Sequence, residues 1–409
     1  MKNFGKLNKK LLLINVFFLQ AYLLRFVIPW PIEYPSNLME ILIGFQLIFF
    51  VLWKTKTSSF IKMVQRISAH WIILSLIALS GLSLIINEII DPLSVLRHIK
   101  FLVFASILAF IFLESFDKNS DRSKAINIAG YGAIIFGIFS IFFNLFGYNV
   151  AHDLRLNGPL DSAVYLAYYL TPFFIWFAIR FLENTRYKKN LILAIILFIL
   201  IIATRSMGAI GGSIGVLTIY LFLTHRKKIL KSWAVKIGLS LILITTSVVI
   251  FYSKILPSLQ TDYSSLDERG EIWETSFNLL SQPRNLIFGL GYGQFQEHYF
   301  QNVKSVIGHS PLDYYVLQPH NIFLIFLSHY GILGLIFIFY CILLNLKNLL
   351  FSKNLNPLPF RINFIILYFF THGLIDTPIF KNDLLFLFIL FLEIGLNYCK
   401  PDTKSIKEL

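Results

Sequence analysis

Long apolar runs recur along almost the whole chain and restrict it to a helical membrane protein. Hydrophobic residues make up 56% of the 409 residues, charged residues make up 14%, and the mean hydropathy is +0.69. A bilayer core about 30 Å thick needs roughly 20 apolar residues for each helical span. We therefore predict an all-α fold, in which residues 1–409 form a single integral, polytopic membrane domain.

About twelve transmembrane helices are expected from the lengths of these runs. They lie near residues 11–30, 36–53, 70–88, 98–115, 125–148, 162–183, 188–204, 206–225, 232–252, 320–346, 358–376 and 382–399. One long polar interval, residues 253–319, separates spans nine and ten. Loops this long are usually functional or disordered, and its many aromatic residues argue against disorder. We predict a folded loop that carries part of the active site.

The basic residues predict the orientation of the chain. The N-terminus and the ends of the even-numbered spans carry about 26 of the 36 Lys and Arg residues. The positive-inside rule then puts both termini in the cytoplasm and the 253–319 loop outside. Trp30, Trp53, Trp71 and Trp233 fall at span ends, as expected of aromatic belts. The net charge of +14 comes from Lys and Arg residues in short interhelical loops, where orientation signals belong. We therefore do not attribute this charge to nucleic-acid binding and expect no nucleic-acid partner.

Arg205 stands at the only polar break in an apolar run, residues 191–223, that is too long for one span. Both flanks of this run are basic, so both should be cytoplasmic, which requires a tight hairpin. The turn then lies near Arg205 and puts its charge at the external end of the two helices. A charge there is expected to have a partner. Anion binding is one interpretation, and a guanidinium that extends to the membrane interface is the other.

Arg269 lies early in RGEIWETSFNLL, whose apolar residues are spaced for one face of a helix. A guanidinium offers a planar, bidentate fork that never loses its charge, which suits a diphosphate. The alternative is a surface arginine paired with Asp267 or Glu268.

His320 lies where the external loop returns to the membrane, between Pro319 and Asn321. A neutral imidazole near pH 7 can accept a proton from an attacking hydroxyl. The alternative is a histidine with a purely structural role.

Two further polar blocks are predicted at the outer ends of spans, RLNGPLDS and HGLIDTPIFKND. Polar groups beside an apolar core are functional candidates, although helix capping by Asp161 and Asp376 is the alternative. The glycines of FGLGYGQF are expected to form tight turns, because no strand and helix frame them as a nucleotide site. The candidate supporting residues are Arg155, Asn321, Asp376, Lys381 and Asp383.

Several of these motifs together resemble the O-antigen ligase and polymerase superfamily of bacterial membrane glycosyltransferases. The matching stretches are TRSMG at 204–208, RGEIW followed by FGLGYGQF, PHN at 319–321 with its continuation to GILGL, HGLIDTPIFKNDL at 372–384, and RLNGPLDS. The resemblance covers the second half of the chain well and the first half mainly through topology.

The resemblance implies a donor oligosaccharide on undecaprenyl diphosphate, a glycan or lipid acceptor, and a place in the bacterial cytoplasmic membrane. It implies that Arg205 and Arg269 bind the diphosphate and that His320 helps to activate the acceptor hydroxyl. No metal or cofactor is expected. An outward cavity that joins these three residues and opens to lipid would fit this reaction.

Three alternatives stay open at the level of sequence. A transporter of a small anion such as bicarbonate would place charges at mid-depth and tends to show inverted repeats, which are not evident here. A protein O-oligosaccharyltransferase would use the same donor with a different acceptor. A structural scaffold would leave Arg205 and His320 unexplained.

Overall fold

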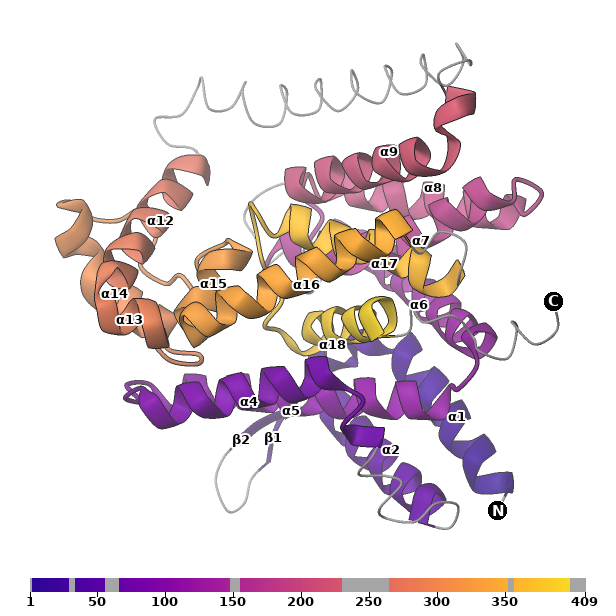
Figure 1. The fold of residues 1–409 in the computed structure, drawn as a ribbon, viewed down its shortest axis with the longest axis horizontal. Helices are drawn as coiled ribbons and strands as arrows, with labels where there is room; N and C mark the ends of the chain where they lie inside the picture. Colours follow the sequence, from indigo (N-terminus) through magenta and orange to yellow (C-terminus); the bar gives the residue numbers. More distant parts are fainter. Residues whose placement is uncertain are drawn as a thin grey trace.

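The computed structural model describes residues 2–28, 34–55, 66–147, 155–229, 265–351 and 357–397, and these are almost wholly helical (Figure 1). The first half holds α1 (Lys2–Phe17), η1 (Leu19–Leu23), β1 (Arg25–Ile28), β2 (Tyr34–Asn37), α2 (Leu38–Thr55), α4 (Trp71–Ile86), α5 (Pro92–Ser115), α6 (Asn119–Leu145) and α7 (Ala163–Glu183). The second half holds α8 (Lys188–Ala203), α9 (Met207–Ile229), α12 (Ser265–Ser281), α13 (Pro283–Phe288), α14 (Phe295–Ile307), α15 (Ile322–Tyr330), α16 (Ile332–Phe351), α17 (Pro357–His372), α18 (Asn382–Leu392) and η3 (Glu393–Asn397).

Within the described ranges, six helices are long and apolar enough to cross a membrane. They are α2, α5, α6, α7, the Met207–Thr224 part of α9, and α16, and the apolar α4 is somewhat shorter. These helices support the predicted polytopic membrane fold. The number of about twelve spans stays a prediction, and the expected span at 232–252 lies outside the described residues.

Two of the expected spans are not single helices. The helix expected over 11–30 ends at Phe17, and a short antiparallel hairpin of β1 and β2 follows, with Arg25 opposite Asn37. The β-branched and aromatic residues of RFVI favour a strand. The helix expected over 320–346 is divided into α15 and α16 at Gly331, which has a φ of +63°.

Helix α18 occupies the middle of the bundle (Figure 1). Its residues from Leu384 to Leu392 are all buried, as are most residues of α17 beside it. A helix that is apolar all round belongs in a core. Because α17 and α18 are both held in this core, the loop that joins them, residues 373–381, has a fixed position at one end of the bundle.

The described part of the predicted external loop consists of α12, α13 and α14, which gather on the left of the molecule in Figure 1. Gly289, Gly291 and Gly293 all have positive φ, so the chain turns sharply between α13 and α14. This turn attaches the segment to the start of α5, since Ser94 Oγ donates to Gly293 O at 2.8 Å.

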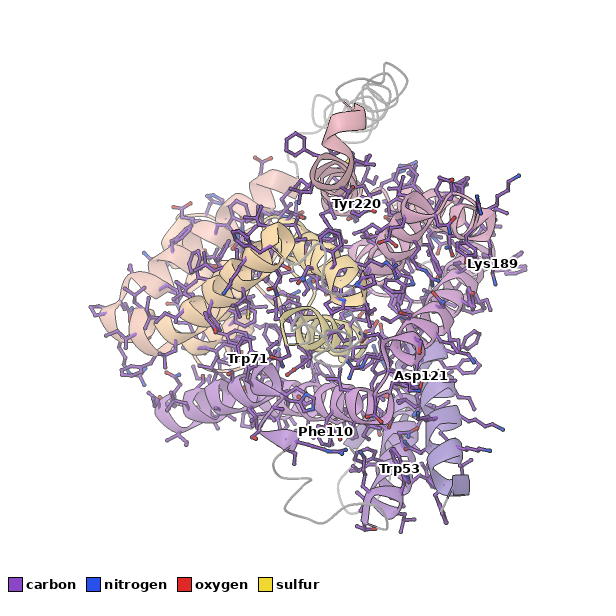
Figure 2. The ribbon with its side chains drawn as sticks, turned by 45° about the vertical axis from the view of Figure 1, so that its right-hand side comes forward. Trp53, Trp71, Phe110, Asp121, Lys189 and Tyr220 are labelled. Carbon is purple, nitrogen blue, oxygen red and sulfur yellow. The ribbon has the colours of Figure 1, made fainter. Side chains whose placement is uncertain are left out.

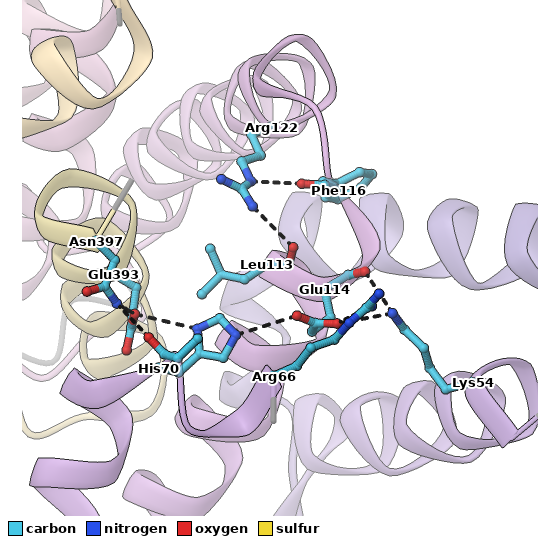
Figure 3. A network of polar contacts seen from close by, with 10 residues as sticks. Lys54, Arg66, His70, Leu113, Glu114, Phe116, Arg122, Glu393 and Asn397 are labelled. Atoms are coloured by element: carbon cyan, nitrogen blue, oxygen red, sulfur yellow. Dashed lines mark hydrogen bonds and ion pairs between the residues drawn. The ribbon is translucent and has the colours of Figure 1, made fainter. Parts of the chain in front are cut away.

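The other end of α5 carries a network of charged side chains (Figure 3). Glu114 accepts from Lys54 at 3.1 Å and from Arg66 at 2.9 Å, and His70 lies between Glu114 and Glu393. The network therefore ties together α2, the start of α4, α5 and η3. Figure 2 shows Trp53, Asp121 and Lys189 on the right of the molecule, with Trp71 to the left of them.

Candidate functional site

Asp376 is the centre of a polar cluster built from three separate parts of the chain. Its Oδ1 lies 2.9 Å from His320 Nδ1, and its Oδ2 accepts from Arg269 Nη2 at 3.2 Å. The carboxylate is buried, whereas the His320 side chain is 31% exposed and the Arg269 side chain is 18% exposed. A fixed anion therefore holds two groups that are themselves partly exposed.

The backbone around Asp376 is held by the end of α17. The Asp376 N–H donates to His372 O, and His372 Nδ1 donates to Asp376 O, each at 3.0 Å. Thr377 Oγ1 also donates to Gly373 O at 3.1 Å. These local bonds fix the direction of the carboxylate before any contact with the other two residues.

His320 is brought to this loop by the start of α15. The Asn321 side chain caps the helix by accepting from the Phe323 and Leu324 N–H groups, and its Nδ2 donates to Leu374 O at 3.0 Å. The Ile322 N–H donates to Gly373 O at 2.6 Å. The predicted supporting residue Asn321 therefore both begins the helix and places His320 beside Asp376.

Arg269 reaches Asp376 from α12. Trp273 lies one helical turn further along, and its Nε1 donates to Pro319 O at 2.9 Å. Residues four apart share one face of a helix, so this bond also directs Arg269 toward Asp376. In the sequence, Trp273 stands out only as part of the apolar helix face, although its spacing of four from Arg269 and its indole donor indicate this role.

Arg205 lies in the tight turn between α8 and α9, as the sequence predicts. Arg205 and His320 are the only described non-glycine residues with positive φ, at 52° and 51°. Such backbone is uncommon outside glycine and clusters at functional sites. The Arg205 side chain is exposed and makes no hydrogen bond or ion pair to any described residue.

The other predicted supporting residues each have partners other than Asp376. Lys381 pairs with Asp161 at 3.0 Å. Asp383 is buried in the first turn of α18 and accepts from Gln20 of η1 at 2.8 Å. Arg155 is adjacent to Leu156, whose N–H donates to Ala203 O near the end of α8. The structure thus gathers Arg269, His320 and Asp376, and puts Lys381, Asp383 and Arg155 on neighbouring elements.

The charged neighbours of Asp376 determine the ionisation state of its carboxyl group. Burial alone would raise the pKa of Asp376, but the charges of His320 and Arg269 lower that pKa to about 2. In the neighbouring pair, burial lowers the pKa of the Lys381 ammonium, and Lys381 holds the pKa of Asp161 below its usual value despite burial. Asp376 is therefore an anion at neutral pH.

A cavity of about 370 Å³ lies beside the cluster rather than on it. Gln318 and Lys381 line it, but Arg205, Arg269 and His320 do not. This cavity is not the one that the sequence predicts to join those three residues. Among the described residues, no group of three or more His, Cys, Asp or Glu side chains is arranged to hold a metal ion.

Residues 192–339 match the family model described as O-antigen ligase, a range that contains Arg205, Arg269 and His320. No curated protein matches the chain. The family match confirms the predicted relation to the O-antigen ligase and polymerase superfamily. Together with the six apolar helices, it indicates a bacterial membrane protein of polysaccharide biosynthesis.

Proposed function

Because residues 192–339 relate this chain to the O-antigen ligase and polymerase superfamily, we propose that it is a glycosyltransferase. It moves an oligosaccharide from an undecaprenyl-diphosphate carrier to a glycan or lipid acceptor. The reaction takes place at the outer face of the cytoplasmic membrane, where the predicted orientation puts residues 253–319. Neither alternative from the sequence, an anion transporter or a protein O-oligosaccharyltransferase, is favoured by the family match.

The observation that carries this proposal is the convergence of Arg269 and His320 on one buried carboxylate. Asp376 is 107 residues from Arg269 and 56 residues from His320 in the chain. A histidine held by a carboxylate has a fixed ring orientation and tautomer, which is the arrangement of a general base. A guanidinium beside it supplies the positive charge that a departing phosphate requires.

The proton moves to Nε2 of His320. With the Asp376 carboxylate at 2.9 Å, Nδ1 carries the ring hydrogen, so Nε2 keeps its lone pair. As the acceptor hydroxyl oxygen bonds to the anomeric carbon of the donor sugar, Nε2 takes the hydroxyl proton. Asp376 stabilises the imidazolium that results.

The leaving group is the lipid diphosphate. The bond between the anomeric carbon and the phosphate oxygen breaks, and its electron pair stays on that oxygen. Arg269 has five N–H donors and uses one in its bond to Asp376. The other guanidinium N–H groups can donate to the diphosphate oxygens. Arg205 adds a second cation from the hairpin turn. Both stabilise the transition state more than the ground state, and direct displacement inverts the anomeric centre.

The test is to express the chain in a bacterium that lacks its own ligase and polymerase and to supply the native lipid-linked glycan. Surface polysaccharide is then analysed on a gel for wild type, His320→Ala and His309→Ala. His309 is a matched control because it lies in the same segment with a 62% exposed side chain.

The expected result is new glycan from wild type and from His309→Ala, and none from His320→Ala. A ladder of repeats would identify a polymerase, and single transferred units would identify a ligase. Normal product from His320→Ala would overturn the proposal, provided that all three proteins are present in the membrane at equal amounts.

A further inference from the structure

The cavity beside the Asp376 cluster has a surplus of positive charge. Four basic side chains line it, from Arg25, Arg97, Lys100 and Lys381, against one lining acid, Asp161. We call it the basic cavity. It lies among η1, the β1–β2 hairpin, the first turns of α5, the start of α7, and the two loops that lead to His320 and away from Asp376.

Two of the four cations are already neutralised. Lys381 pairs with Asp161 at 3.0 Å, and Lys100 pairs with Glu40 at 3.1 Å. Arg25 and Arg97 are exposed and form no ion pair within the described part of the chain. A concave surface with unbalanced charge of one sign attracts ligands of the opposite sign, so the basic cavity is suited to an anionic group.

The basic cavity also contains the side-chain amide of Gln318, which is available to bind a ligand. Gln318 lines it, is only 8% exposed, and makes no side-chain hydrogen bond to any described residue. A carboxamide has two N–H donors and an oxygen acceptor, and buried polar groups are normally satisfied. A ligand rich in hydroxyl groups could accept hydrogen bonds from the amide N–H groups and donate one to the amide oxygen.

Aromatic side chains form a large part of the remaining lining, together with Ser36, Asn37, His98 and Leu317. Tyr22, Phe101, Tyr165 and Phe380 line the basic cavity. A volume of about 370 Å³ is at the small end of ligand sites. Flat apolar walls, one open amide and two open guanidiniums together suit a sugar ring with a charged substituent better than a bare phosphate ion.

We propose that the basic cavity binds a sugar unit that carries an anionic substituent, a carboxylate or a phosphate. This inference rests on the proposed function, because it makes the cavity a subsite for the glycan. Gln318 is two residues before His320, which corresponds to at most about 7 Å of backbone. A unit held there lies next to the reacting centre, so the enzyme selects glycans with an acidic sugar at that position.

The experiment measures binding to the full chain in lipid nanodiscs by saturation-transfer NMR. The probes are methyl glucuronoside, methyl glucoside 6-phosphate and neutral methyl glucoside. Both anionic probes, or one of them, should bind about tenfold more tightly than the neutral one, and the better probe identifies the substituent. Equal binding of all three would overturn the proposal.

The variants locate the binding. Arg97→Gln and Gln318→Ala should each weaken binding of the anionic probe by about tenfold. Lys304→Gln, which removes an exposed charge from α14, should leave it unchanged. Arg25→Gln is a second charge variant if Arg97→Gln is unstable. The proposal is overturned if the arginine variants weaken binding of farnesyl diphosphate and leave the glycosides unaffected, because the cavity would then hold the lipid diphosphate.

Failure of this inference can be distinguished from failure of the proposed function. Glycoside binding requires no transfer, so it is measured equally well in His320→Ala. Active His320→Ala protein would remove the proposed mechanism, whereas a lack of preference for anionic glycosides would remove only the subsite.

Discussion

Gly208 lies directly against the ring of His372. A Cβ atom at Gly208 would be 2.9 Å from Cδ2 and 3.0 Å from Nε2 of that ring. The hairpin turn that holds Arg205 is thereby packed against the end of α17, where His372 bonds to the backbone of Asp376. The first turn of α9, three residues after Arg205, therefore packs against the helix end that leads to Asp376.

Gly208→Ala should lower glycan transfer by roughly 10- to 100-fold, because displacement of a site by about 1 Å can cost that much. His372 is fully buried between Tyr168 and Tyr368 and has little room to move. Transfer is measured in membranes with matched amounts of protein.

Gly211→Ala is the control, since nothing lies within 4 Å of a Cβ at that position. It should keep full activity and stabilise α9 by about 0.5–1 kcal/mol. Equal activity of the two alanine variants would contradict the packing argument.

Asp376→Asn should lower the transfer rate by about 10²- to 10⁴-fold, the usual contribution of general base catalysis. The amide keeps the shape of the side chain but cannot stabilise an imidazolium. Asp313→Asn is the same change at an exposed residue of the external segment and should have full activity. A rate for Asp376→Asn near that of wild type would exclude the carboxylate from the mechanism.

The ionisation of Asp376 should not limit transfer anywhere between pH 5 and 8. The pKa of Asp376 is lowered to about 2, so its stabilising charge is present above the ordinary carboxyl pKa of about 3.9 and is lost only as the pH falls toward 2. Between pH 5 and 8 the carboxylate therefore stays ionised, and its contribution to transfer should be constant.

Asp376→Asn should therefore remain impaired at every pH between 5 and 8, because no part of that range restores the lost charge. The measurement is the residual rate of Asp376→Asn across that range, with Asp313→Asn as the reference. A rate of Asp376→Asn equal to that of Asp313→Asn at any pH in this range would contradict the role of the carboxylate.

The turn at Arg205 could be predicted from sequence because two local signals agree. Residues 191–223 are too long for one span, and both flanks are basic, so topology alone requires a hairpin. The structure ends α8 at Ala203 and begins α9 at Met207.

The pairing of Arg269 and His320 through Asp376 could not be predicted in the same way. Each residue stands out in its own segment, but their contact depends on how α12, α15 and α17 pack. The break at Gly331 shows a similar limit. In sequence this glycine interrupts an apolar run only weakly, yet a Cβ there would lie 2.0 Å from Ile287 O. Close approach of α13 requires a glycine at this point.

Glu114→Gln should strongly destabilise the folded protein. Its carboxylate is 11% exposed and meets Lys54, which is 7% exposed, together with Arg66 and His70 (Figure 3). Removal of one member of a buried ion pair leaves the other charge uncompensated and costs about 3–5 kcal/mol. Asp121→Asn is the control, because the Lys9–Asp121 pair is 38% and 42% exposed and should contribute less than about 1 kcal/mol. Thermal unfolding in detergent compares the two, and equal shifts in Tm would contradict the assignment of Glu114 as the anion that holds α2, α4 and α5 together.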